Sequence, residues 1–155
     1  MLKPFLFGGP GTGSKYADVG LLVFRVAIGL MLALGHGWGK LPPEGLKEFA
    51  GFLASHNVPA PTLSAWAAMF AELAGGLLLA FGLFTRPAAV LVAFTMLVAV
   101  VTAHWSDPVF SRTGPSKELA LLYGLAAVLL VFTGAGRYGV DPLFRRRERM
   151  SSRSR

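Results

Sequence analysis

The sequence contains no cysteine among its 155 residues. This absence excludes disulfide bonds, thiol redox chemistry within the chain and metal sites built on thiolates. Charged residues are also scarce, at 15% of the chain, whereas 54% of the residues are hydrophobic. A soluble domain of this length needs more polar surface, so the composition indicates a membrane protein with one compact domain.

The apolar segments predict the fold class. Residues 1–18 are rich in glycine and proline and lack a long apolar run, so we expect an irregular lead-in without a cleavable signal peptide. Four segments then have the composition of membrane-spanning helices: residues 19–40, 63–84, 88–105 and 116–133. Between the first two, the spacing of Leu46, Phe49, Phe52 and Leu53 predicts a short amphipathic helix on the membrane surface.

We therefore predict an all-α membrane protein, a bundle of four transmembrane helices over residues 19–142. Residues 143–155 form a basic tail with six arginines. An even number of spans places both termini and the turn at 84–87 on one side, together with most of the cations that give the net charge of +7. The positive-inside rule makes that side cytoplasmic, in a membrane of the bacterial cytoplasmic (inner) type. The tail then anchors the chain at anionic lipid, and no nucleic-acid partner is expected.

A polar stripe runs along the first span. At about 100° per residue, one side of the helix carries Arg25, Gly29, Leu32, His36 and Lys40. Since a charge facing lipid is costly, this side should face other helices or a wet cavity. The second span has one ionisable residue, Glu72, which we place at the depth of Arg25. The sequence thus predicts a buried Arg25–Glu72 ion pair, which either only fixes the helix packing or also lines a substrate or proton path.

A second polar group is expected at the outer ends of the spans. It comprises His36, Lys40, His104 and Glu118. These residues are either interfacial anchors or the mouth of an apolar pocket, in which His36 and Glu118 handle protons. The ligand-binding residues of such a pocket would be Arg25, Gly29, Lys40, Glu72 and His104. Haem is not expected, because no attachment motif exists, and His36, His104 and Glu118 give at most three ligands for zinc, so no metal is expected.

Three segments of the chain resemble a known family. LLVFRVAIGLMLALGHGWGKL is similar to the first-span signature of the DoxX family, which has an arginine, a glycine and a G-x-x-K-L-like end. FAELAGGLLLAFGLFTRPAAVLVAFTM resembles the family's second and third spans, and KELALLYGLAAVLLVFTGAGRYGVD its fourth span and closing segment, ending at Asp141. The resemblance covers about residues 18–142. The family's polar positions correspond to Arg25, Lys40, Glu72 and Glu118.

The resemblance implies a small four-helix membrane protein, often tied to redox functions. Family members include a subunit related to thiosulfate:quinone oxidoreductase. The leading hypothesis is a membrane subunit of a redox system that binds quinone or quinol, or that supports a partner oxidoreductase. Two alternatives stay open: a non-catalytic scaffold that recruits or stabilises an enzyme complex, and a transporter or channel for a small solute. Small glycine and alanine faces also favour a homo-oligomer.

Overall fold

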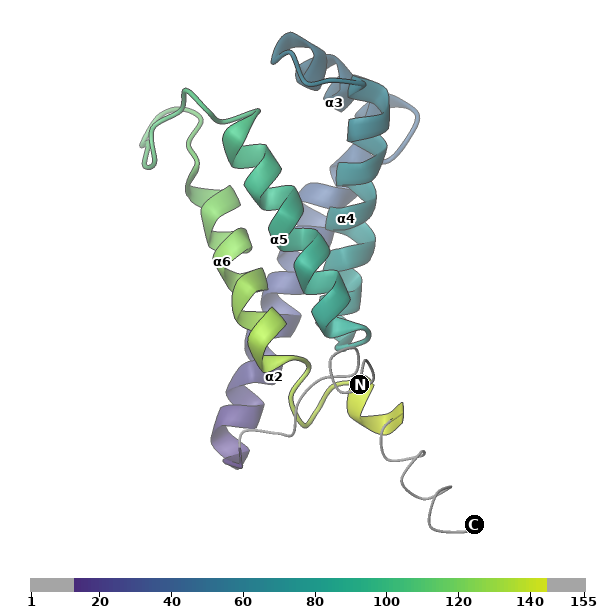
Figure 1. Ribbon diagram of the computed structural model, residues 1–155, viewed down its shortest axis with the longest axis vertical. Helices are drawn as coiled ribbons and strands as arrows, with labels where there is room; N and C mark the ends of the chain where they lie inside the picture. The colour runs from purple at the N-terminus through teal and green to yellow at the C-terminus, as the bar shows by residue number, and fades with distance from the viewer. Residues whose placement is uncertain (1–12, 145–155) are drawn as a thin grey trace.

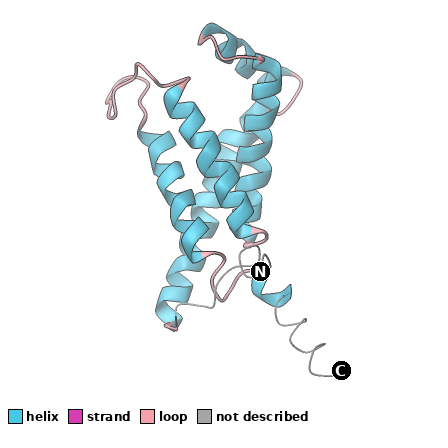
Figure 2. Cartoon of the chain, viewed as in Figure 1, coloured by secondary structure: helices cyan, strands magenta, loops and turns pink. Residues whose placement is uncertain are grey.

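The computed structural model describes residues 13–144, and every regular element in this part of the chain is a helix (Figure 2). The elements in order are α2 (Lys15–Leu32), η1 (Ala33–Gly37), η2 (Trp38–Lys40), α3 (Glu44–Ser55), α4 (Pro61–Phe81), α5 (Thr85–Val101) and α6 (Glu118–Thr133). Because η1 is a π-helical turn and η2 a 3-10 turn, the first helical segment continues to Lys40. Four long helices run side by side, and α3 lies across one end of the molecule (Figure 1).

Two of the helical segments are long and apolar enough to cross a membrane. They are Lys15–Lys40, with 26 residues, and Pro61–Phe81, with 21 residues. Helices α5 and α6 are also apolar but are shorter, at 17 and 16 residues, or about 25 Å each. Large apolar side chains are exposed on all four helices, among them Val23, Phe70, Phe94 and Phe132. Apolar side chains that face outward on every helix are typical of a surface that contacts lipid.

Glycines let the first helical segment, α2 with η1, approach α4 until the backbones touch. A Cβ atom added at Gly29 would lie 2.5 Å from the carbonyl oxygen of Gly76, and one added at Gly37 would lie 2.5 Å from the backbone nitrogen of Leu73. No side chain fits at either position. This close contact fixes how far each helix can slide along the other.

The predicted Arg25–Glu72 ion pair is wrong. Glu72 pairs with Lys40 instead, and Arg25 donates hydrogen bonds to backbone carbonyl groups. The reason is that α2 and α4 are staggered along their axes. The prediction places Arg25 and Glu72 at the same depth in the membrane, which requires the ends of the two helices to lie at the same level. Arg25 lies level with the end of α4 and is ten residues from the start of α2 at Lys15. Glu72 lies beside Lys40, where the first helical segment ends, and is eleven residues from the start of α4 at Pro61. Helix α2 therefore projects beyond one end of α4, and α4 projects beyond Lys40 toward α3 (Figure 1).

Arg25 binds the carboxyl end of α4. Its Nη1 atom donates to the carbonyl oxygens of Leu79, at 3.2 Å, and Ala80, and its Nη2 atom donates to the carbonyl oxygen of Tyr138 at 2.9 Å. The last carbonyl groups of a helix lack partners within the helix and lie at the negative end of its dipole. This environment suits the guanidinium group of Arg25, a residue that is only 1% exposed. Arg25 thus links α2, α4 and the segment that follows α6.

Asp141 links the same segment to α5. Its carboxylate accepts hydrogen bonds from the backbone N–H groups of Phe84, at 2.7 Å, and Thr85, at 3.0 Å, which open α5. The turn before α5 contains Gly82 in the left-handed conformation, with a φ of 67°. A side chain there would meet the guanidinium of Arg25 at 2.8 Å. The chain after α6 therefore closes the end of the molecule opposite α3.

The remaining boundaries differ from the predicted ones by up to four residues. Helix α2 begins at Lys15, so residues 15–18, which were expected to belong to an irregular lead-in, are helical. Helix α5 ends at Val101 rather than near residue 105, so His104 lies in the turn after the helix. Helix α6 begins at Glu118, and it packs along α5 (Figure 1). The predicted surface helix is present as α3, which buries Leu46 and Leu53 against α4. Residues 1–12 and 145–155, which include most of the predicted lead-in and basic tail, lie outside the described residues.

Candidate functional site

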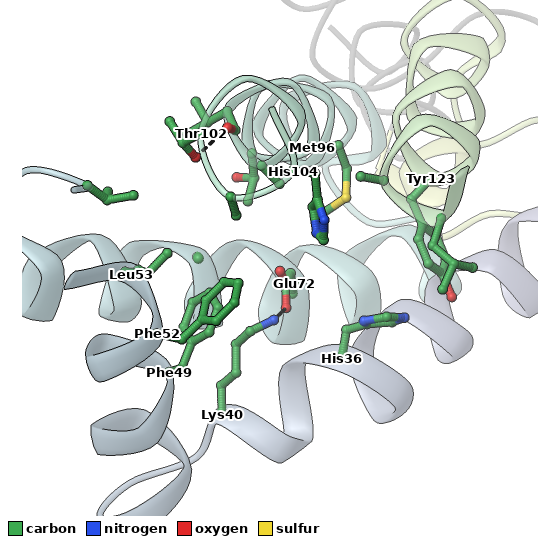
Figure 3. A pocket seen from close by; sticks show the side chains of 18 of the residues that line it. His36, Lys40, Phe49, Phe52, Leu53, Glu72, Met96, Thr102, His104 and Tyr123 are labelled. Carbon is green, nitrogen blue, oxygen red and sulfur yellow. Dashed lines mark hydrogen bonds and ion pairs between the residues drawn. The ribbon is translucent and has the colours of Figure 1, made fainter. Parts of the chain in front are cut away.

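A cavity of about 480 Å³ lies at the end of the molecule that carries α3. The end of the first helical segment, α3, α4, α5 and α6 all contribute to its wall, together with the loop before α6. Its apolar lining includes Leu32, Phe49, Phe52, Leu53, Val58, Met96, Val98, Ala99, Leu119 and Ala120. Its ionisable side chains are His36, Lys40, Glu72, His104 and Tyr123. Figure 3 shows these side chains around one hollow. The volume lies within the range of about 300–1,000 Å³ that is usual for small-molecule sites.

An ion pair between Lys40 and Glu72 forms one side of the cavity. The two side chains are 15% and 8% exposed, so both charges are largely removed from water. The ammonium group of Lys40 also lies 4.5 Å from the centre of the Phe49 ring, which is a cation–π contact from α3. The pair is neutral as a unit, and it holds α3 and α4 together beside the cavity. Its remaining donors and acceptors are available to a polar ligand.

His36 and Tyr123 meet on a second side of the cavity. Their rings pack edge to face, with centroids 5.2 Å apart and an interplanar angle of 77°. The wide π-helical turn of residues 33–37 lets Gly37 contact α4 while His36 reaches α6. Such turns occur frequently at functional sites. The contact places an imidazole and a phenol, both able to donate and accept protons, within an apolar surrounding.

His104 enters the cavity from the side of α5, across from Lys40 and His36 (Figure 3). Its Nδ1 atom lies 2.7 Å from a carboxylate oxygen of Asp107, three residues later in the same turn. The two side chains are 29% and 19% exposed, so this pair lies at the mouth. The turn orients the imidazole, because the carboxylate fixes one of its two ring nitrogens.

The structure brings together four of the residues that the sequence singled out: His36, Lys40, Glu72 and His104. Arg25, Gly29 and Glu118 are not among the residues that line this cavity. Arg25 lies at the opposite end of α4, Gly29 in the α2–α4 contact, and Glu118 half-buried in the first turn of α6. Within residues 13–144, no three histidine, aspartate or glutamate side chains lie together as metal ligands would.

Sequence reasoning missed Tyr123 and Asp107. Tyr123 is the one residue with a side-chain hydroxyl between the first and last residues of α6, and an isolated polar group in an apolar span is a usable signal. Asp107 follows His104 by three residues, but the interaction depends on the turn that replaces the expected end of the helix. Phe49 and Phe52 were expected to face the membrane surface, and they also line the cavity.

Comparisons with known proteins agree with the resemblance. The DoxX family model matches residues 20–105. The Bacillus subtilis protein named "Putative oxidoreductase CatD" is 31% identical over 130 residues, which cover 83% of this chain and 90% of that protein. The Escherichia coli inner membrane proteins YphA and YqjF are 32% and 31% identical, over 82% and 86% of this chain and 96% and 98% of their own lengths. No solved structure matches.

Proposed function

The chain belongs to the DoxX family of membrane proteins, and from this premise we propose that it is a four-span subunit of a redox system that binds quinone or quinol. The observation that carries the proposal is the cavity of about 480 Å³, with apolar walls and a few ionisable groups. A quinone needs a slot for its ring and tail, and donors or acceptors for its two oxygens. The name of the Bacillus subtilis relative supports a redox role.

The proposed topology has α2, α4, α5 and α6 as spans, with both termini on the cytoplasmic side. The distribution of lysine and arginine in the sequence supports this orientation. The chain offers a clean test, because it lacks cysteine and each introduced thiol is the only one present. In intact cells, a membrane-impermeant maleimide should label Thr113→Cys, in the loop before α6, and should not label Ser151→Cys until the membrane is opened. The reverse pattern would overturn the orientation.

The polar side chains have distinct roles in the proposed complex. The Lys40 ammonium donates a hydrogen bond to a ligand oxygen, while Glu72 balances its charge. His36, supported by Tyr123, exchanges a proton with the ligand. Phe49 and Met96 contact the ring, because aromatic and thioether groups pack well on a flat π-system. Electron transfer is assigned to a partner oxidoreductase, since none of these side chains is a redox group.

Binding of a short-chain benzoquinone tests the proposal. The full chain, purified in a mild detergent, would be titrated while tryptophan fluorescence is followed, because Trp105 adjoins His104 at the mouth. Mass spectrometry of the same sample would detect retained native quinone. We expect saturable quenching, and a roughly tenfold weaker affinity for His36→Ala, since one lost hydrogen bond is worth about 1.4 kcal/mol.

The matched control is His56→Ala. His56 is exposed at the end of α3 and does not line the cavity. This variant should bind as the unmodified protein does. Quenching that does not saturate, together with no retained quinone, would overturn the quinone proposal. Equal loss of affinity in both histidine variants would show that His36 has no specific role in binding.

A further inference from the structure

His104 and Asp107 form a pair that the proposed function leaves unused. The Nδ1 atom of His104 lies 2.7 Å from the Asp107 carboxylate, and its ring lines the cavity (Figure 3). Both residues belong to the short turn after α5, so the pair is held by local backbone rather than by distant packing. A carboxylate that binds one nitrogen of an imidazole fixes which ring nitrogen carries the proton.

Asp107 determines whether the other ring nitrogen of His104, Nε2, donates or accepts a hydrogen bond. A carboxylate only accepts hydrogen bonds, so Nδ1 of His104 must be the donor. In the neutral imidazole, Nε2 then carries a lone pair and acts as an acceptor. Within residues 13–144, no hydrogen bond to this Nε2 atom is recorded. The mouth of the cavity therefore offers an acceptor to a molecule inside it.

The opposite side of the cavity has the complementary character. The Lys40 ammonium is a donor only, and the Glu72 carboxylate is engaged by it. A ligand that satisfies both sides needs an acceptor oxygen toward Lys40 and an O–H group toward His104. A hydroquinone has both, because each hydroxyl donates and accepts. A quinone has two carbonyl oxygens, which accept hydrogen bonds and cannot donate them to Nε2.

We propose that His104, positioned by Asp107, selects the reduced, hydroxylated form of the ligand by accepting a hydrogen bond from its O–H group. This inference rests on the proposed function, because it concerns the same cavity. His104 contacts the ligand, and Asp107 acts through His104 as a positioning residue. The cavity then binds a hydroquinone more tightly than the corresponding quinone.

The test compares a short-chain hydroquinone with its quinone under anaerobic conditions, using the full chain in mild detergent and calorimetric titration. The unmodified protein should bind the hydroquinone about tenfold more tightly, which corresponds to one additional hydrogen bond. His104→Ala should weaken hydroquinone binding and leave quinone binding nearly unchanged. His56→Ala, which alters the exposed histidine that follows α3, should change neither affinity.

The Asp107→Asn variant tests whether Asp107 acts by fixing the proton of His104 on Nδ1. An asparagine amide can donate to Nδ1, which moves the imidazole proton to Nε2 and converts the acceptor into a donor. The preference should then shift toward the quinone, an effect that loss of stability alone does not produce. Equal binding of both forms, or an unchanged preference in Asp107→Asn, would overturn this inference and leave the quinone site intact. Binding of neither form would overturn the proposed function itself.

Discussion

Substitution of Arg25 by alanine removes the guanidinium group that joins α2 to the end of α4. The group is almost fully buried, and its hydrogen bonds go to the carbonyl oxygens of Leu79, Ala80 and Tyr138. The end of α4 and the segment that follows α6 lose their common partner at once. The substitution also tests the arrangement of the buried charges, because the sequence alone favours a bond between Arg25 and Glu72.

The expected cost follows from these three hydrogen bonds. Bonds that involve a charged group contribute about 1.5–3 kcal/mol each, but keeping the guanidinium away from water costs several kcal/mol. The net loss expected for Arg25→Ala is therefore about 3–5 kcal/mol. At roughly 2–4 °C per kcal/mol for a chain of this size, the midpoint of thermal unfolding should fall by about 6–20 °C. Arg25→Lys should recover part of the loss, since an ammonium cannot reach both sides of the site as the planar fork does.

Glu72→Gln provides the comparison. Its partner, Lys40, retains some access to water and the contact with the Phe49 ring, so this substitution should cost about 1–2 kcal/mol. The costs of Arg25→Ala and Glu72→Gln should add within about 0.5 kcal/mol, because the residues share no partner. The assay is thermal unfolding in mild detergent, followed by far-ultraviolet circular dichroism. Equal costs for the two single variants, with no further loss in the double variant, would refute the reasoning.

Three further predictions concern the interactions that hold the helices together. Gly29→Ala should lower the free energy of unfolding by about 1–3 kcal/mol, because the added methyl group meets the backbone of α4. Gly35→Ala, whose methyl group meets nothing within 4 Å, should be neutral or stabilising. Thermal unfolding of both variants checks this. Asp141→Ala should lower the free energy of unfolding by about 1–2 kcal/mol, because α5 loses its cap. Asp141→Asn should lower it less, because the amide oxygen still accepts one hydrogen bond. An equal decrease in both variants would argue against capping. Lys40→Met combined with Glu72→Gln should cost clearly less than the sum of the single substitutions, and a double-mutant cycle that gives no coupling would exclude the ion pair.

Much of the fold could be predicted from the sequence, because apolar runs and helix-breaking residues act locally. The four long helices and α3 were each expected, and the observed ends differ from the expected ones by a few residues. The largest differences, of four residues each, are the start of α2 at Lys15 and the end of α5 at Val101. The residues from Thr102 onward are still partly apolar, but they form a turn, so composition alone does not mark this boundary.

The candidate site was predicted in part for the same reason. Ionisable residues in apolar segments are visible in any sequence, and His36, Lys40, Glu72 and His104 were all identified in this way. Their partners were not identified. The pairing of Lys40 with Glu72 depends on the stagger of α2 and α4, and the contact of His36 with Tyr123 depends on a π-helical turn.

The sequence by itself determined which segments are helical, which are apolar, and which few residues carry charge among them. Those properties follow from hydropathy, from the absence of cysteine and from local backbone preferences. Only the tertiary structure decided which charges meet. Gly29 and Gly37 fix the contact between the first helical segment and α4, and this contact sets the offset that brings Lys40 to Glu72 and Arg25 to the end of α4. A shift of one helical turn, about 5.4 Å along the axis, changes every such partner while it leaves the pattern of apolar residues the same.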